Sequence, residues 1–208
     1  MTVRTALIFF LLFIFLPNAV ASERTVSVYS VEGSAHLIRS GRTTDLKMDQ
    51  ACERGDRIDT SAGSRVDLSV YRFAGCRITG ACRLEHTLES DVQFELIEGL
   101  FMVHMDASSA NQMTVDAGLG TAEATGATFL CRLYRTADGR AATSFAAGEG
   151  TLFVTLKHSG ATVKIPEHHS IDVTEDTYVP LVRSISAGEA EDLKQASSLV
   201  IANWPDSR

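Results

Sequence analysis

The chain has 208 residues and a formal net charge of −7, with 22% charged residues and no basic stripe. That balance excludes nucleic acid and anionic lipid surfaces as natural partners. A chain of this length can bury a core as one domain without depending on metals or disulfides.

Residues 1–21 have the pattern of a cleavable signal peptide. Arg4 supplies the positive start, Ala6 to Leu16 is an unbroken apolar run, and residues 19–21 form a small-x-small cleavage site. The run has 11 residues, whereas about 20 are needed to span a bilayer. An uncleaved anchor is the alternative. We expect a periplasmic or secreted protein with no membrane span after signal cleavage.

Four cysteines remain after cleavage: Cys52, Cys76, Cys82 and Cys131. An even number in an oxidising compartment predicts two disulfides, with three possible pairings. Cys76 and Cys82 flank Gly80, so a turn is expected to bring them together and leave Cys52 to pair with Cys131. One bridge and two buried thiols is the alternative. The spacings fit neither a zinc knuckle nor a redox pair.

From residue 24 onward, apolar and polar residues alternate with a period of two, which is typical of strands. The runs are 26–30, 35–39, 66–71, 94–96, 100–105, 129–134, 141–145, 152–156, 161–165 and 170–173, with Glu98-Gly99 between the fourth and the fifth. Asp138-Gly139 is a two-residue hairpin signal, and Ser159-Gly160 has the same role in the next pair of runs. Runs that recur about every 10 residues predict an all-β sandwich, barrel or solenoid.

One helix is predicted near the C-terminus. Ser186 and Glu189 form a capping box, and Ala190, Leu193 and Val200 follow at helical spacing. Trp204-Pro205 is expected to end this helix, which either docks on the β domain or serves a partner as a linker. The expected organisation is a signal peptide (1–21), a β domain (22–180) and a C-terminal helical tail (181–208).

Five short elements occur in a fixed order over about residues 25–155. They are Gly-Asp-Arg-Ile-Asp-Thr at 55–60, Ser-Ala-Gly-Ser-Arg-Val-Asp-Leu at 61–68, Leu-Ile-Glu-Gly-Leu-Phe-Met-Val at 96–103, Ala-Thr-Gly-Ala-Thr-Phe at 124–129 and Ala-Gly-Glu-Gly-Thr-Leu at 147–152. In order and spacing they resemble the FecR domain, whose third element is a hairpin. The resemblance implies an extracytoplasmic two-layered, solenoid-like sandwich of short strands with a binding role.

The chain departs from the FecR pattern at two places. Ala127 stands where the family has a threonine, and Ala74-Gly75 replaces an Asp-Gly turn. The neighbouring Cys76 is expected to compensate for the weaker turn through a cross-link. Well-studied relatives control a sigma factor through a cytoplasmic domain and a membrane span. Only about five residues precede the apolar run here, so that role is not expected to transfer.

Catalytic signatures are missing from the sequence, which has neither a G-x-S-x-G elbow nor an H-E-x-x-H zinc motif. The best chemical candidate is His168, Ser170 and Asp172, which share one face of a strand and form a weak binding site for a metal or a sugar. An exposed hairpin end is the main alternative. No metal and no cofactor is expected, and the chain is predicted not to be an enzyme.

The leading functional hypothesis is a non-catalytic periplasmic FecR-domain protein. It would be a binding or scaffolding module in envelope signalling or assembly that contacts another envelope protein, for example by strand pairing. A carbohydrate- or peptidoglycan-associated binding protein is the alternative, although Trp204 is the only tryptophan and stacking platforms are few. A hydrolase with an unrecognised site is third.

Overall fold

The structure is a computed structural model that describes residues 26–88, 91–199 and 201. This part contains sixteen strands and one helix, which confirms the all-β prediction. The predicted signal peptide and Trp204-Pro205 lie outside the described residues. The elements are β1 (Val26–Glu32), β2 (Ala35–Arg39), β3 (Arg42–Asp45), β4 (Ala51–Cys52), β5 (Arg57–Thr60), β6 (Arg65–Val70), β7 (Ala74–Leu88), β8 (Asp91–Met105), β9 (Gln112–Ala117), β10 (Gly120–Thr125), β11 (Thr128–Arg135), β12 (Ala141–Glu149), β13 (Leu152–Leu156), β14 (Thr162–Ile165), β15 (His169–Thr174), β16 (Arg183–Ser184) and α1 (Ala187–Ser197).

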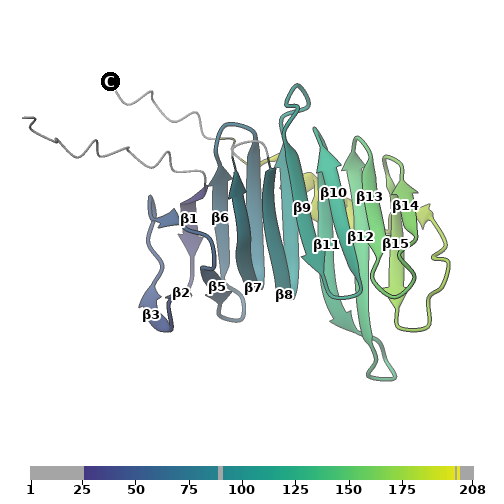
Figure 1. The fold of residues 1–208 in the computed structure, drawn as a ribbon, viewed down its shortest axis with the longest axis horizontal. Coiled ribbons are helices and arrows are strands. Elements are labelled where there is room, and N and C mark those ends of the chain that lie inside the picture. The colour runs from purple at the N-terminus through teal and green to yellow at the C-terminus, as the bar shows by residue number, and fades with distance from the viewer. Residues whose placement is uncertain (1–25, 89–90, 200, 202–208) are drawn as a thin grey trace, which may run out of the picture.

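The strands follow one another along the long axis of the molecule and wind between two layers (Figure 1). The helix-covered layer contains β4, β1, β6, β11, β12, β15 and β16, and the open layer contains β3, β2, β5, β9, β10, β13 and β14. The long strands β7 and β8 belong to both layers. After β8 the chain places hairpins alternately in the open and helix-covered layers, which confirms the sandwich.

The two layers meet where β7 and β8 bend together at Gly80 and Gly99, which are paired. A Cβ on Gly80 would lie 2.2 Å from the Glu98 carbonyl oxygen, and one on Gly99 would lie 2.0 Å from that of Thr79. Both glycines have positive φ, at +117° and +86°, which side chains disfavour. Residues 96–103 are therefore part of one bent strand, and the hairpin expected there is wrong.

Apolar side chains from both layers fill a shared interior. Phe94 of the open half of β8 meets Phe101 of the other half, with ring centroids 4.9 Å apart. Each buried side chain of this size contributes roughly 1.5–3 kcal/mol. The largest fully buried residues are Phe73, Phe94, Phe101, Phe129, Phe145, Leu37, Leu68, Ile78, Leu96, Met105, Met113 and Leu130.

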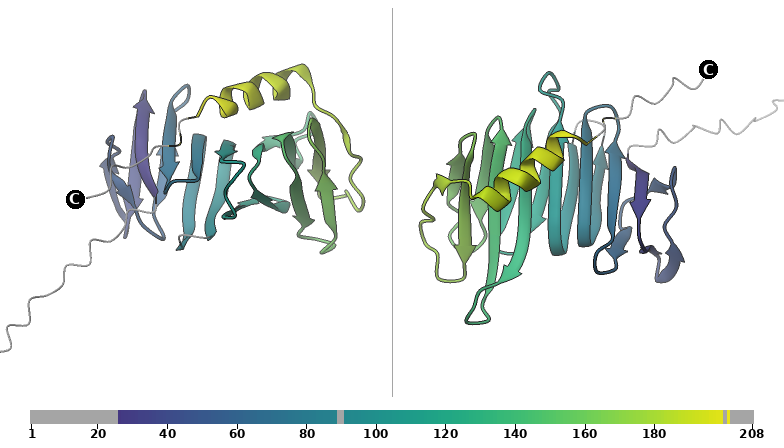
Figure 2. Two further views of the ribbon diagram at one scale, coloured as in Figure 1. Left: turned by 90° about the horizontal axis from the view of Figure 1, so that it is seen from above. Right: turned by 180° about the vertical axis from the view of Figure 1, so that it is seen from behind.

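Helix α1 crosses the outer face of the helix-covered layer (Figure 2). Leu193 and Ala196 pack there on Met102, Leu130 and Ala146, so β12 is buried on both faces. The predicted capping box of Ser186 and Glu189 is confirmed. Among the described residues, no helix has the length and apolar character of a membrane span.

The β11–β12 hairpin has a longer loop than Asp138-Gly139 suggested. The Thr136 N–H donates to the Arg140 carbonyl, and the Gly139 N–H donates to the Thr136 carbonyl. This geometry is a three-residue loop with a bulge at Gly139, whose φ is +84°. Between β13 and β14 the loop likewise spans residues 157–161 rather than two residues.

The expected disulfides are not formed, and all four cysteines are buried free thiols. Cys76 and Cys82 lie on one continuous strand, β7, so no turn brings them together or cross-links Ala74-Gly75. Cys52 on β4 and Cys131 on β11 are separated by β1, β6, β7 and β8 in the same layer, which corresponds to about 24 Å at ~4.8 Å per strand. A disulfide needs Cα atoms roughly 4.4–6.8 Å apart.

Candidate functional site

The bend in β7 and β8 makes the sheet fork on both sides. On one side β6 pairs with β7 as far as Ile78, and β5 takes over at Ala81. On the other side β9 pairs with β8 as far as Leu96, and β11 takes over at Leu100. Each fork leaves a groove between the diverging strands, and Glu98 lines both grooves.

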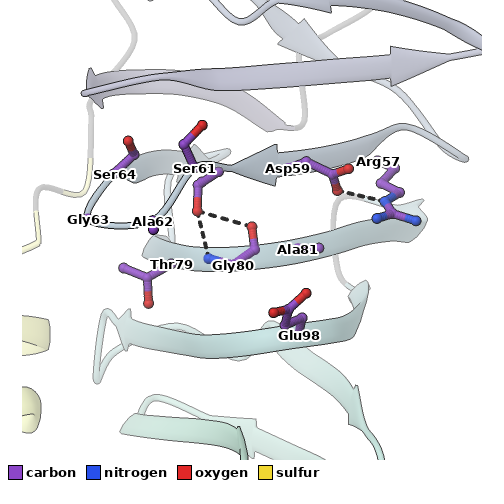
Figure 3. Close-up of a pocket in the computed structure, with 11 residues that line it drawn as sticks. Arg57, Asp59, Ser61, Ala62, Gly63, Ser64, Thr79, Gly80, Ala81 and Glu98 are labelled. Atoms are coloured by element: carbon purple, nitrogen blue, oxygen red, sulfur yellow. Dashed lines mark hydrogen bonds and ion pairs between the residues drawn. The ribbon is translucent and has the colours of Figure 1, made fainter.

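The first groove, which we call the sealed groove, is lined by residues 57, 59–64, 79–81 and 98, with a volume of about 390 Å³ (Figure 3). Most of its lining comes from the first two FecR-like elements. The Thr60 hydroxyl donates to the Gly80 carbonyl at 3.1 Å and accepts from the Gly80 N–H at 2.6 Å. One side chain thus satisfies both backbone groups that the diverging strands leave open.

Two charged side chains on one wall of the sealed groove, Arg57 and Asp59, are paired with each other. Arg57 Nε donates to Asp59 Oδ1 at 2.6 Å, and Figure 3 shows the two side chains pointing toward each other on one wall. The hydrogen bond to Asp59 raises the pKa of Arg57. Beside the groove, Asp56 is 2% exposed and accepts two hydrogen bonds from Arg39, at 2.8 and 2.6 Å. The Gly-Asp element therefore stabilises the fold.

The second groove, which we call the open groove, is the larger, with a volume of about 660 Å³. Its walls are β8 at Ile97 and Glu98, the β9–β10 turn at Gly118-Leu119, and the far ends of β11 and β12. The turn rests on the opposite layer, since the Leu119 N–H donates to the Thr143 hydroxyl at 3.2 Å. The apolar lining is only half-buried.

The edge of β11 that faces the open groove has no strand partner among the described residues. The β8–β11 ladder ends at Arg132, while β11 continues beside β12 to Arg135. Because the Thr136 N–H bonds to β12, alternation in an antiparallel pair directs the backbone groups of Leu133 and Arg135 away from β12. The last pair of the β8–β11 ladder, Arg132 with Leu100, is a non-hydrogen-bonded pair, so the Leu133 N–H still donates to the Gly99 carbonyl. The Leu133 carbonyl and the N–H and carbonyl of Arg135 face the open groove.

The residues predicted as a binding face separate in the structure. Ser170 and Asp172 point toward α1, whereas His168 lies in the turn before β15 with an exposed ring, 3.2 Å from Glu167. Its φ of +59° takes it out of the strand alternation. The structure thus joins Ser170 with Asp172 but not with His168.

Ser170 and Asp172 belong instead to an ion network that fastens α1, here called the latch. Arg183 binds Glu189 through two hydrogen bonds, at 2.8 and 3.0 Å, and Asp172 through two more, at 3.0 and 2.7 Å. Ser144 and Ser170 add hydroxyl contacts to Glu189 at 3.2 and 3.4 Å. Three side chains and the Ser186 backbone N–H, at 2.6 Å, thereby satisfy the carboxylate of Glu189, a residue that is 4% exposed.

The latch has marked electrostatic consequences. Burial alone would raise the pKa of Glu189, but hydrogen bonds from Arg183 and Ser186 outweigh it and lower the pKa to about 2. The same pairing raises the pKa of Arg183. Both groups therefore stay charged over the physiological range, so the latch acts as a structural fastener.

Reactive groups in the described part are few and enclosed. Burial raises the pKa of the Cys52 thiol to about 12 and raises that of Cys131 as well. The His104 ring contacts the Thr128 hydroxyl at 2.8 Å, but Thr128 is 1% exposed. Within residues 26–88, 91–199 and 201, no group of three or more His, Cys, Asp or Glu side chains is arranged to hold a metal ion.

Sequence reasoning missed the features that define both grooves. The contact of Thr60 with Gly80 joins residues 20 apart, and the free edge of β11 exists only because β8 bends at Gly99. The available signal was a glycine inside an apolar run, which marks a bulge or a close backbone approach. Arg183 carried no sequence signal of its own.

Neither a family model nor a curated protein matches the chain. Among solved structures it is similar to a candidate anti-sigma factor from Parabacteroides distasonis, with a TM-score of 0.53 and 14% identity over 67% of this chain and 64% of that one. A second such structure from the same organism has a TM-score of 0.43 and 12% identity over 63% and 56% of the two chains. The chain spans less than two thirds of each, and the first likeness shows a shared fold.

Proposed function

We propose that this chain is a non-catalytic extracytoplasmic module that binds another envelope protein, in signalling or assembly. The observation that carries the proposal is the free edge of β11 in the open groove. Backbone N–H and carbonyl groups at strand spacing are satisfied by another extended chain. The signal-peptide pattern of residues 1–21 and the fold shared with a candidate anti-sigma factor support the compartment and the role.

A glycan is a poorer occupant of this groove. Sugar-binding faces stack pyranose rings on several aromatic side chains, and Tyr134 is the one aromatic residue that lines the open groove. Its hydroxyl already donates to Asp172 at 3.3 Å. Binding to the cell wall is therefore the competing outcome of the test.

The test is cross-linking capture from envelope extract with two variants at one position. Arg135→Pro removes a backbone N–H that faces the groove, whereas Arg135→Ala keeps it and removes the same side chain. A protein captured by wild type and Arg135→Ala but lost with Arg135→Pro supports the proposal. Retention by purified cell wall alone, unaffected by Arg135→Pro, contradicts it.

Compartment is tested separately by fractionation of cells that express the full chain. The expected result is a mature protein shortened by cleavage after Ala21 and recovered with periplasmic or secreted markers. An uncleaved chain in the cytosolic fraction would contradict the extracytoplasmic part of the proposal.

A further inference from the structure

The open groove constrains the side chains of its occupant as well as its extended conformation. The inference drawn from it rests on the proposed function. We infer that its occupant is an extended segment of a partner protein, with apolar side chains at alternate positions and a basic residue opposite Glu98.

Backbone pairing requires that the occupant of the groove be extended. The free carbonyl of Leu133 and the free N–H and carbonyl of Arg135 lie two residues apart on one edge, which is the spacing of a strand. A partner residue opposite Arg135 can exchange both an N–H and a carbonyl with it, and a second N–H of the partner can bond to the Leu133 carbonyl. A helix cannot do so, because its own backbone groups are already bonded within the helix.

The apolar wall sets one face of the segment. Leu133 packs with the inner core on the same side as Cys131, and Leu119 is among the partly buried residues that join this core. Ile97 closes the opposite wall of the groove and is also half-buried. Since side chains of a strand alternate between faces, every second residue of the segment would meet these aliphatic side chains.

The charge of Glu98 determines which kind of residue the segment carries opposite it. Glu98 is exposed, and no ion pair is formed with it among the described residues. The nearby Arg57 is engaged with Asp59 at 2.6 Å. Across the groove, the Arg135 guanidinium donates to the Gly139 carbonyl at 3.0 Å and lies at the outer end of the edge. A lysine or arginine of the partner would complement Glu98, in a chain whose net charge is −7.

The test uses three synthetic peptides as probes, with binding to the full mature protein followed by fluorescence anisotropy. The first alternates valine with lysine, the second replaces lysine with glutamate, and the third is the first with N-methylated backbone amides. The lysine peptide is expected to bind best. N-methylation and Arg135→Pro are each expected to weaken it about tenfold through the lost backbone hydrogen bond and the added steric bulk. Arg135→Ala, which keeps the backbone N–H, is the matched control for loss of the side chain, and the weakening by Arg135→Pro is measured against it.

Glu98→Gln separates the charge from the backbone. It is expected to weaken the lysine peptide about two- to fivefold, as for an exposed ion pair, and to leave the discrimination against N-methylation unchanged. Equal binding of the lysine and glutamate peptides, or no binding of either, overturns the inference. If Arg135→Pro still abolished capture of a protein from envelope extract, the proposed function would nevertheless stand. Self-association that Arg135→Pro abolishes would make a second copy the occupant, and this also overturns the inference.

Discussion

The two grooves arise from the same bend but end in opposite states. In the sealed groove the Thr60 hydroxyl occupies both free backbone groups of Gly80, at 3.1 and 2.6 Å. In the open groove, no described side chain does the same for the Leu133 carbonyl or for the N–H and carbonyl of Arg135. A fork in a β-sheet therefore leaves backbone groups without a strand partner. One well-placed hydroxyl decides whether those groups are satisfied within the fold or remain available to a partner.

The largest expected effect on stability tests whether the bend at Gly80 and Gly99 gives rise to both grooves. Gly99→Ala places a Cβ 2.0 Å from the Thr79 carbonyl oxygen at a φ of +86°, so β7 and β8 must move apart. The free energy of unfolding should fall by about 3 kcal/mol or more, measured by urea denaturation. Gly160→Ala, at a φ of +68° with open space around it, is the control and should cost about 1 kcal/mol. Equal costs would mean that the bend is not fixed by close backbone contact.

Acid should loosen the latch that fastens α1 to the helix-covered layer and spare the sealed groove, where the Thr60 bridge does not titrate. The pKa of Glu189 is lowered from 4.5 to about 2 in the folded protein, so its contribution is complete above about pH 4.5 and is lost as the pH falls toward 2. The loss should reach about 2–3 kcal/mol.

Hydrogen exchange at falling pH would locate this loss. Protection should fall first in α1 and β16, while the β5–β6 turn keeps its protection. Glu189→Gln should remove the pH dependence at a cost to stability throughout, and Glu191→Gln, on the exposed side of the same helix, should leave it intact. Simultaneous loss in both regions would contradict a local latch.

Unsealing the first groove should have an intermediate effect. Thr60→Val keeps the shape of the side chain but leaves the Gly80 N–H and carbonyl without their partner. The expected cost is about 1–2 kcal/mol in urea denaturation, and Thr60→Ser, which retains the hydroxyl, should recover most of it. If valine and serine cost the same, the hydroxyl does not seal the groove, and the contrast between the two grooves fails.

Local chemistry was predictable from the sequence, whereas contacts between distant strands were not. The strand predicted at residues 66–71 and the capping box of Ser186 and Glu189 depend on neighbours along the chain, and both appear in the structure, the strand as β6 ending at Val70. The bend at Gly99 depends on the backbone of another strand, and the latch joins Asp172 to Arg183 and Glu189 through tertiary packing. The cysteine pairing failed for the same reason, because parity and spacing contain no information on where β4 and β11 lie in the sheet.

The smallest expected effect is the sharpest test of the open edge. Arg135→Pro removes an N–H that faces the groove and should cost less than about 1 kcal/mol, since proline is tolerated where a strand has no partner. Tyr134→Pro, one residue earlier, removes an N–H that points to β12 and should cost about 2 kcal/mol or more. A reversed order in urea denaturation would place the free backbone groups on the other side of β11. The edge would then be paired within the fold, and the open groove would differ from the sealed groove in size alone.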